Sequence, residues 1–308
     1  LWRGHQGEAL DWSIVQRNLA GRQSSHTALG RARAKGAAAA VRQGRPPADL
    51  VIDTGRGWRG YRRGTLSDCQ GMVMTHKGIV ACGHVETARA AAAVLDAGGN
   101  AFDAALAAMC AACVAEPILA SLGGGGFLLA RPAASAAAAA PVVFDFFGQT
   151  PKIRLPASDI DFVPVEADFG STRQAFHIGM GSVATPGVVK GLFEAHRVLG
   201  RMPMREIVAP AVELARRGVV TTPMQAYMAG VVGAILKHTP ESFTLLASPA
   251  RPAELVQAGE VYRLPELADV LEILAIEGED LFYRGEIADR IAEGCRLAGG
   301  QLTMADLH

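Results

Sequence analysis

The chain has 308 residues, 50% of them hydrophobic, which is enough for one large or two modest domains with buried cores. Thirty basic residues balance thirty acidic residues, so no net field attracts nucleic acid or an anionic membrane. The longest apolar stretch, 101–115, is shorter than the roughly 20 residues that cross a bilayer, and Asp103 lies near its start. We therefore expect a folded protein with neither a nucleic-acid partner nor a membrane span.

The first 68 residues are rich in arginine, glycine and alanine and contain few large apolar side chains. Such a segment cannot offset its ordering entropy by burial, so 1–68 is predicted to be a disordered extension of a domain at 69–308. Its arginines, including those at 56, 59, 62 and 63, are a possible nucleic-acid contact, but Trp58 and Tyr61 are the only aromatic residues interleaved with these four, and a solvated extension is favoured. The segment has no signal-peptide pattern.

The cysteine content favours a reducing compartment. An odd number of sparse cysteines does not form a disulfide framework, which favours the cytoplasm over the periplasm, although secretion stays open. Cys110 and Cys113 have C-x-x-C spacing, yet they lie inside an alanine-rich helical pattern and not at a helix N-terminus. Core packing is therefore predicted for both, not redox chemistry. The five cysteines are Cys69, Cys82, Cys110, Cys113 and Cys295.

The first predicted elements are two helices and a hairpin. Helical spacing over 85–97 ends at Gly98-Gly99, and Asn100 is a suitable N-cap for an apolar, buried helix over 101–115. After the glycine run 123–126, the apolar run 127–130 predicts a fully buried strand, and 142–146 predicts its partner in a central sheet.

The last third is predicted to be mainly helical, with Gly218 ending one helix as a C-cap. The predicted helices are 187–199, 204–217, 222–236, 264–277 and 285–297.

Several familiar sites are not supported by the motifs. The glycine run follows a helix, opens a strand and has no lysine nearby, which argues against a nucleotide site. The histidines show no zinc-binding spacing, so neither a metal nor another cofactor is expected, and His196 is predicted to be structural. Ser121 and Ser182 lack the strand-to-helix setting of a nucleophile elbow.

Read together, a series of segments resembles the large subunit of gamma-glutamyltranspeptidases. The resemblance covers residues 71–308 in order and at compatible spacing. Its segments are 71–73, 88–105, 116–117, 123–127, 182–192, 195–196, Gly200, 210–211, 214–215, Gly218, 282–288 and 299–307.

The resemblance implies an α+β N-terminal-nucleophile hydrolase, a four-layer αββα sandwich of which this chain is the incomplete, large-subunit part. Such an enzyme is a zymogen that cuts itself into a large and a small subunit. The exposed threonine then attacks a gamma-glutamyl amide, and its own α-amino group, with a pKa near 7.7 to 8.0, acts as the base. The implied partners are a small-molecule gamma-glutamyl or other amide substrate and the small subunit of the same precursor.

No residue of this chain receives a catalytic role from the resemblance. The nucleophile is expected beyond His308, and Thr303 lies in a stretch that caps a helix. We therefore expect no acyl transfer from this chain alone.

Phe147 and Gly148 occupy the positions that match the family's substrate-binding Arg-Glu pair. A phenyl ring cannot form the charge-assisted contact that a guanidinium forms with the substrate carboxylate, so glutathione is in doubt as substrate. A cephalosporin-acylase-like amidase is one alternative. In another alternative, a different arginine of this chain binds the substrate carboxylate, or the loop aligns with the family's Arg-Glu pair at a position shifted by one residue.

A non-enzymatic alternative is an inactive truncated paralogue or a binding module. Without a small subunit, the elements after residue 71 are expected to leave apolar faces uncovered.

Overall fold

The computed structural model describes residues 72–75, 78–132 and 140–308, all of which belong to the unit Cys69–His308. The predicted extension 1–68 lies outside the described residues, and its disorder stays a prediction. The strands are β1 (Met72–Thr75), β2 (Gly78–Ala81), β3 (Gly126–Ala130), β4 (Val142–Phe146), β5 (Val163–Asp168), β6 (Arg173–Ile178), β7 (Val219–Val220) and β8 (Val261–Tyr262). The helices are α3 (Val85–Asp96), α4 (Ala101–Ala115), α5 (Val188–Leu199), α6 (Met204–Arg217), α7 (Pro223–Val231), α8 (Gly233–Leu236), α9 (Pro240–Leu245), α10 (Pro265–Glu277), α11 (Asp280–Tyr283), α12 (Glu286–Leu297) and α13 (Met304–Leu307).

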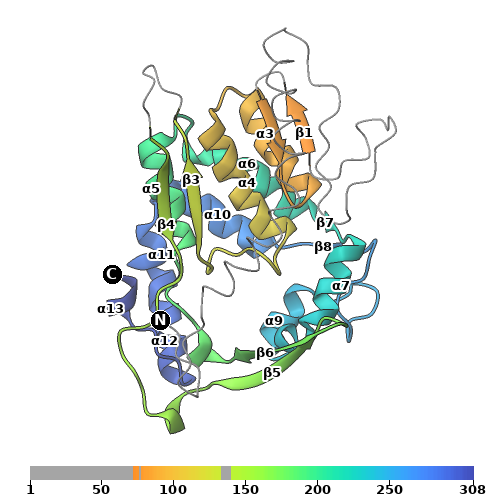
Figure 1. The fold of residues 1–308 in the computed structure, drawn as a ribbon, viewed down its shortest axis with the longest axis vertical. Helices are drawn as coiled ribbons and strands as arrows, with labels where there is room; N and C mark the ends of the chain where they lie inside the picture. The colour runs from red at the N-terminus through yellow and green to blue at the C-terminus, as the bar shows by residue number, and fades with distance from the viewer. Residues whose placement is uncertain (1–71, 76–77, 133–139) are drawn as a thin grey trace, which may run out of the picture. The chain divides into compact units, whose positions relative to one another are not determined.

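The strands within the described residues form antiparallel pairs, β1–β2, β3–β4, β5–β6 and β7–β8 (Figure 1). The predicted hairpin of 127–130 and 142–146 is confirmed, with Leu128 paired to Phe144. The prediction that its first strand is fully buried is wrong. Leu128 packs against the helical core, whereas Phe127 and Leu129 are exposed, because the described elements cover only one face of the hairpin.

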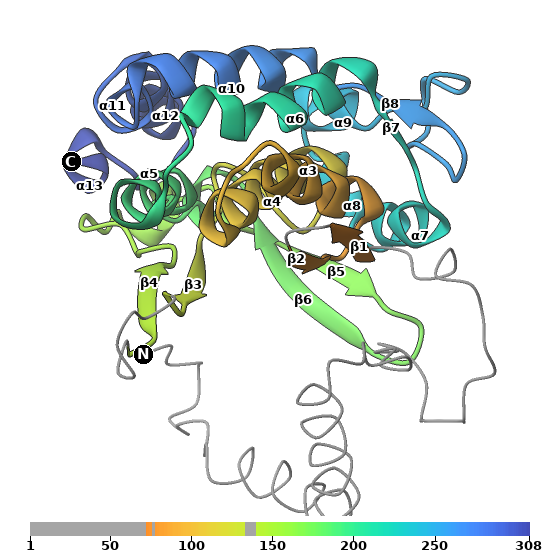
Figure 2. The ribbon, with the colours of Figure 1, turned by 90° about the horizontal axis from the view of Figure 1, so that it is seen from above.

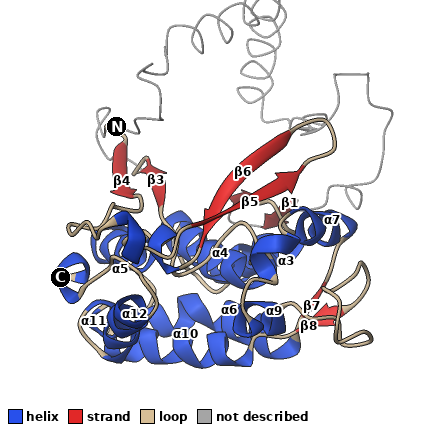
Figure 3. Ribbon diagram, turned by 90° about the horizontal axis from the view of Figure 1, so that it is seen from below, coloured by secondary structure: helices blue, strands red, loops and turns tan. Residues whose placement is uncertain are grey.

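Two helical layers lie behind the hairpins (Figures 2 and 3). In one layer α6 packs against α10, and α6 also contacts α3 and α4 of the other layer. Within that other layer α5 packs on α4. The strands β3 and β4 pack on α5, and β1 and β2 pack on α3. The apolar α4 packs against α3 and α5 within its own layer and against α6 of the other layer, which explains why its sequence is hydrophobic on almost every side. The core of the described unit therefore sits between the helices, with the strands along its edge.

The N-terminus of α4 is built as the sequence predicts. The side chain of Asn100 accepts hydrogen bonds from the N–H groups of Phe102 and Asp103, and Asp103 in turn accepts from the N–H of Asn100 at 2.8 Å. Asp103 is fully buried and its other carboxylate oxygen accepts from the N–H groups of Arg201 and Met202. The cap thus also ties α4 to the connection between α5 and α6.

Most of the later helices agree with the predictions, and Gly218 ends α6 with φ of 100°. The predicted helix 222–236 is instead two helices, α7 and α8, interrupted at Val232 between two glycines of low helix propensity. The β5–β6 hairpin has no counterpart among the predicted elements. The structural role predicted for His196 is confirmed, since its Nε2 lies 2.7 Å from the carbonyl oxygen of Met202.

The predicted core packing of Cys110 and Cys113 is confirmed. Both are buried as free thiols, and burial raises the pKa of Cys113 to about 12 and that of Cys110 further. A thiol that stays protonated is a poor nucleophile, so neither sulfur serves redox chemistry. In the part of the chain that the structure describes, no helix is long and apolar enough to cross a membrane.

Candidate functional site

The glycine run after α4 meets the loop after β4 at very short range. A Cβ atom on Gly125 would lie 2.3 Å from the backbone nitrogen of Gly148 and 2.9 Å from the carbonyl carbon of Phe147. Only glycine allows two backbones to approach so closely. The run is therefore a packing device that fixes the loop carrying the two predicted site residues.

The turn at 185–188 holds the same loop from the other side. Gln149 and Thr185 exchange backbone hydrogen bonds of 3.2 and 2.8 Å, and the carbonyl oxygen of Gly124 accepts from the N–H groups of Gly187 and Val188 at 2.9 and 3.1 Å. A Cβ atom on Gly187 would lie 2.0 Å from the carbonyl oxygen of Phe146. Three chain segments that are distant in sequence are thus joined through their backbones.

The side chain of Phe147 lies outside this joint, 57% exposed. Its ring stacks on Phe127 with centroids 5.4 Å apart and an interplanar angle of 14°. Its N–H donates to the Asp145 carboxylate at 3.1 Å, and its carbonyl oxygen accepts from the Gln149 side chain at 3.3 Å. Leu129 and Val143 extend the same face of the hairpin, so the wall beside the loop is aromatic and aliphatic apart from the exposed Asp145, which pairs with Phe127.

A groove of about 300 Å³ lies between α4 and β3. Phe127 and Leu128 form one side, Met109 lies across from them, and Glu116 is the acidic group in the lining. The Glu116 carboxylate accepts a 2.9 Å hydrogen bond from the Thr87 hydroxyl. Phe127 therefore belongs both to the stack with Phe147 and to the groove.

The structure places Phe147 and Gly148 as neighbours in one loop and adds Phe127, which sequence reasoning did not select. Phe127 pairs with Asp145 in the hairpin register, so Phe147 is its diagonal neighbour and within reach of an aromatic ring. The pairing register of the hairpin is the feature that could have identified Phe127 as a neighbour of Phe147. The alternative that a different arginine binds the carboxylate, or that the loop is aligned one position away, stays a prediction.

Thr303 is a helix-capping residue, as predicted. It precedes α13, and the Asp306 carboxylate accepts from both its N–H and its hydroxyl at 2.8 Å. Burial raises the pKa of Asp306, but hydrogen bonds from the N–H groups of Lys152 and Thr303 and from the Thr303 hydroxyl outweigh it and lower the pKa overall. Thr303 therefore holds the end of the described chain in place and is not positioned as a nucleophile.

The described residues form hairpins backed by helical layers, and glycines allow the loop 147–149 to pack closely against its neighbours, so the scaffold is one of mixed helix and sheet. The model of the family described as gamma-glutamyltranspeptidase matches residues 87–308. The chain belongs to the gamma-glutamyltranspeptidase family, which is a family of enzymes.

Known relatives agree with this assignment. The chain is 31% identical over 249 residues to glutathione hydrolase 3 of Arabidopsis thaliana, covering 80% of this chain and 36% of that protein. It is 31% identical over 235 residues to the acylase ACY 1 proenzyme of Pseudomonas sp. (strain SE83), covering 75% of this chain and 40% of that protein.

Among solved structures, the gamma-glutamyltranspeptidase of Helicobacter pylori superposes with a TM-score of 0.64 at 25% identity, covering 76% of this chain and 64% of that one. Against the curated relatives named above, the chain spans 36% to 40% of their length.

Proposed function

We propose that this chain is the large-subunit part of an amide-hydrolysing or acyl-transferring precursor. In the complete protein, a small subunit supplies the threonine nucleophile and the remaining layers of a four-layer αββα sandwich. The loop at Phe147 and Gly148 forms one wall of the substrate pocket. The family membership supports the proposed reaction class. The uncovered face of the β3–β4 hairpin supports the proposal that a small subunit packs there.

That face is open to solvent and apolar except for Asp145: Phe127 is 63%, Leu129 70% and Val143 60% exposed. Burying one such side chain stabilises a complex by about 1.5–3 kcal/mol, so a protein gains little by leaving the group uncovered. Within the described residues, β3 pairs only with β4, which leaves its other edge without a strand partner.

The acyl group of the substrate is proposed to be less polar than gamma-glutamate. Phe147 and Phe127 present a stacked apolar surface where a carboxylate would need a cation. One relative named above is an acylase. An amidase of that kind is the second candidate, and the aromatic stack is the observation that favours it over glutathione hydrolysis.

The reaction class is tested with the precursor extended past His308. We expect it to separate into two bands on a denaturing gel and, once it has cleaved itself, to release the chromogenic aniline from an acyl anilide. Replacing the threonine at the new N-terminus by alanine serves as the control and should leave one band and no product. An extended precursor that stays uncut contradicts the proposal and supports a binding module, which light scattering should then find monomeric.

Replacing Phe147 by arginine should redirect the acyl preference of that processed enzyme. A charge-assisted contact with a carboxylate contributes about 1.5–3 kcal/mol, so kcat/KM for gamma-glutamyl anilide relative to phenylacetyl anilide should rise about 10- to 100-fold. Phe162→Arg is the matched control, because Phe162 is also exposed and stacked, on His177, but lies away from this loop. An equal ratio in both variants would show that Phe147 does not face the acyl group.

A further inference from the structure

The helix that supports the candidate site has no cap of its own. α5 begins after Gly187, which has no side chain to accept from the first N–H groups of the helix. The N–H of Val188 is instead bonded to the carbonyl oxygen of Gly124 at 3.1 Å. The N–H of Lys190 donates to the phenol oxygen of Tyr283, 93 residues further along the chain, at 3.0 Å.

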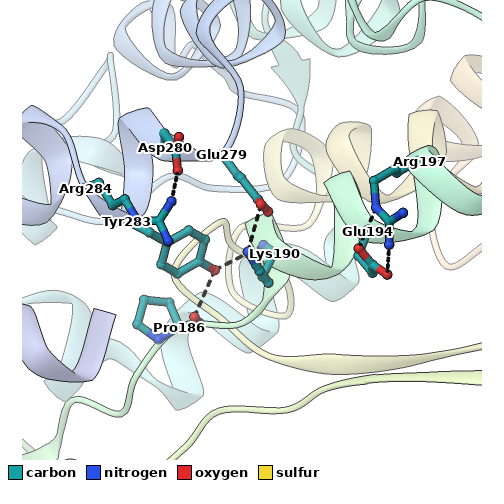
Figure 4. Close-up of polar contacts among 8 residues, drawn as sticks. All are labelled: Pro186, Lys190, Glu194, Arg197, Glu279, Asp280, Tyr283 and Arg284. Carbon is teal, nitrogen blue, oxygen red and sulfur yellow. Dashed lines mark hydrogen bonds and ion pairs between the residues drawn. The ribbon is translucent and has the colours of Figure 1, made fainter. Parts of the chain in front are cut away.

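Tyr283 uses both functions of its hydroxyl group. While its oxygen accepts from Lys190, its O–H donates to the carbonyl oxygen of Pro186 at 3.0 Å (Figure 4). The residue is buried and packs edge-on against Phe282 with ring centroids 5.1 Å apart. Burial raises the pKa of Tyr283 to about 12, so the phenol keeps its proton at neutral pH and can donate.

The turn that Tyr283 holds is the turn that positions the substrate wall. Pro186 lies between Thr185, which exchanges hydrogen bonds with Gln149, and Gly187, which donates to Gly124. Any displacement of this turn is passed to the loop 147–149 and to the glycine run, because backbone hydrogen bonds connect all three. A continuous path of contacts thus leads from α11 to Phe147.

We propose that Tyr283 is a positioning residue that clamps the turn 185–188 and thereby fixes the Phe147–Gly148 loop against substrate. This inference rests on the proposed function, which places that loop in the substrate pocket. Lys190 also forms a 2.7 Å ion pair with Glu279, but its ammonium group is largely exposed, and exposed pairs contribute little. The buried phenol is the part of the contact that holds the turn.

The test compares Tyr283→Phe with Tyr262→Phe in the full precursor. Tyr262 is a matched control, because its buried phenol also donates to backbone carbonyl groups, those of Val114 and Ala115 at 2.9 and 3.0 Å. Hydrogen exchange should accelerate about tenfold in residues 185–191 and in 146–150 of Tyr283→Phe, and in neither segment of Tyr262→Phe.

The kinetic readout separates positioning from general destabilisation. If the wall contacts substrate and transition state equally, KM in Tyr283→Phe should rise about fivefold while kcat changes less than about twofold. Faster hydrogen exchange in 185–191 without any acceleration in 146–150 would show that Tyr283 does not fix the Phe147–Gly148 loop. The same rise of KM in Tyr262→Phe would contradict the proposal too.

If the unsubstituted precursor hydrolyses no anilide, that result contradicts the proposed function but not the role of Tyr283. The hydrogen-exchange experiment still tests whether Tyr283 holds the turn. The unsubstituted protein provides a check that does not depend on any variant. Its Lys190 amide must be protected from exchange although α5 offers it no acceptor, and an unprotected Lys190 amide would overturn the phenol cap.

Discussion

Replacing Asp103 by alanine should lower the free energy of unfolding by about 3 kcal/mol. The carboxylate is fully buried and accepts from the N–H groups of Asn100, Arg201 and Met202. Alanine leaves all three donors without this acceptor, and a donor that stays buried, as on Met202, costs about 1–3 kcal/mol before the structure relaxes. The loss separates α4 from the α5–α6 connection as well as removing its cap.

Urea unfolding followed by circular dichroism measures this loss. Asp103→Asn keeps one acceptor oxygen and should cost about half as much. Asp289→Ala, in the first turn of α12 and exposed, should stay within about 0.5 kcal/mol of the unsubstituted protein. Equal stabilities for Asp103→Ala and Asp289→Ala would mean that the buried carboxylate does not join α4 to the α5–α6 connection.

Elements with a local signal could be predicted from the sequence. The second helix is α4 at the predicted residues, because an N-cap precedes it and Glu116-Pro117 follows it. The β5–β6 hairpin was missed because most of its side chains are exposed on both faces, so no alternation of apolar and polar residues marks it. Pro164 weakens the strand signal further.

The candidate site also contains features that a local sequence signal predicts and features that it does not. Phe147 and Gly148 were selected because a motif identifies their positions, but the stack on Phe127 depends on the hairpin register and on which face stays uncovered. Tyr283 was recognised only as part of a motif. Its cap on α5 joins residues 93 positions apart, and no periodicity within either segment encodes that contact.

Replacing Gly191 by alanine should destabilise the protein by about 1–2 kcal/mol, although alanine is the better helix former. A Cβ atom there would lie 2.2 Å from Cγ and 2.8 Å from Cβ of Phe146, so β4 and α5 must move apart. Overpacking of this kind costs about 1–3 kcal/mol or more, which exceeds the roughly 1 kcal/mol gained in helix propensity. The displacement begins one residue before Phe147 and should therefore reach the substrate wall.

Gly230→Ala separates the cost of overpacking from the gain in helix propensity. Gly230 lies in α7, where a Cβ atom would meet no other atom within 4 Å, so the same substitution should stabilise the protein by about 0.5 kcal/mol. Urea unfolding of both variants should give shifts of opposite sign, and hydrogen exchange in 146–150 should accelerate only in Gly191→Ala. If both glycines tolerate alanine equally, α5 is not pressed against β4, and the support proposed for the Phe147 loop loses its physical basis.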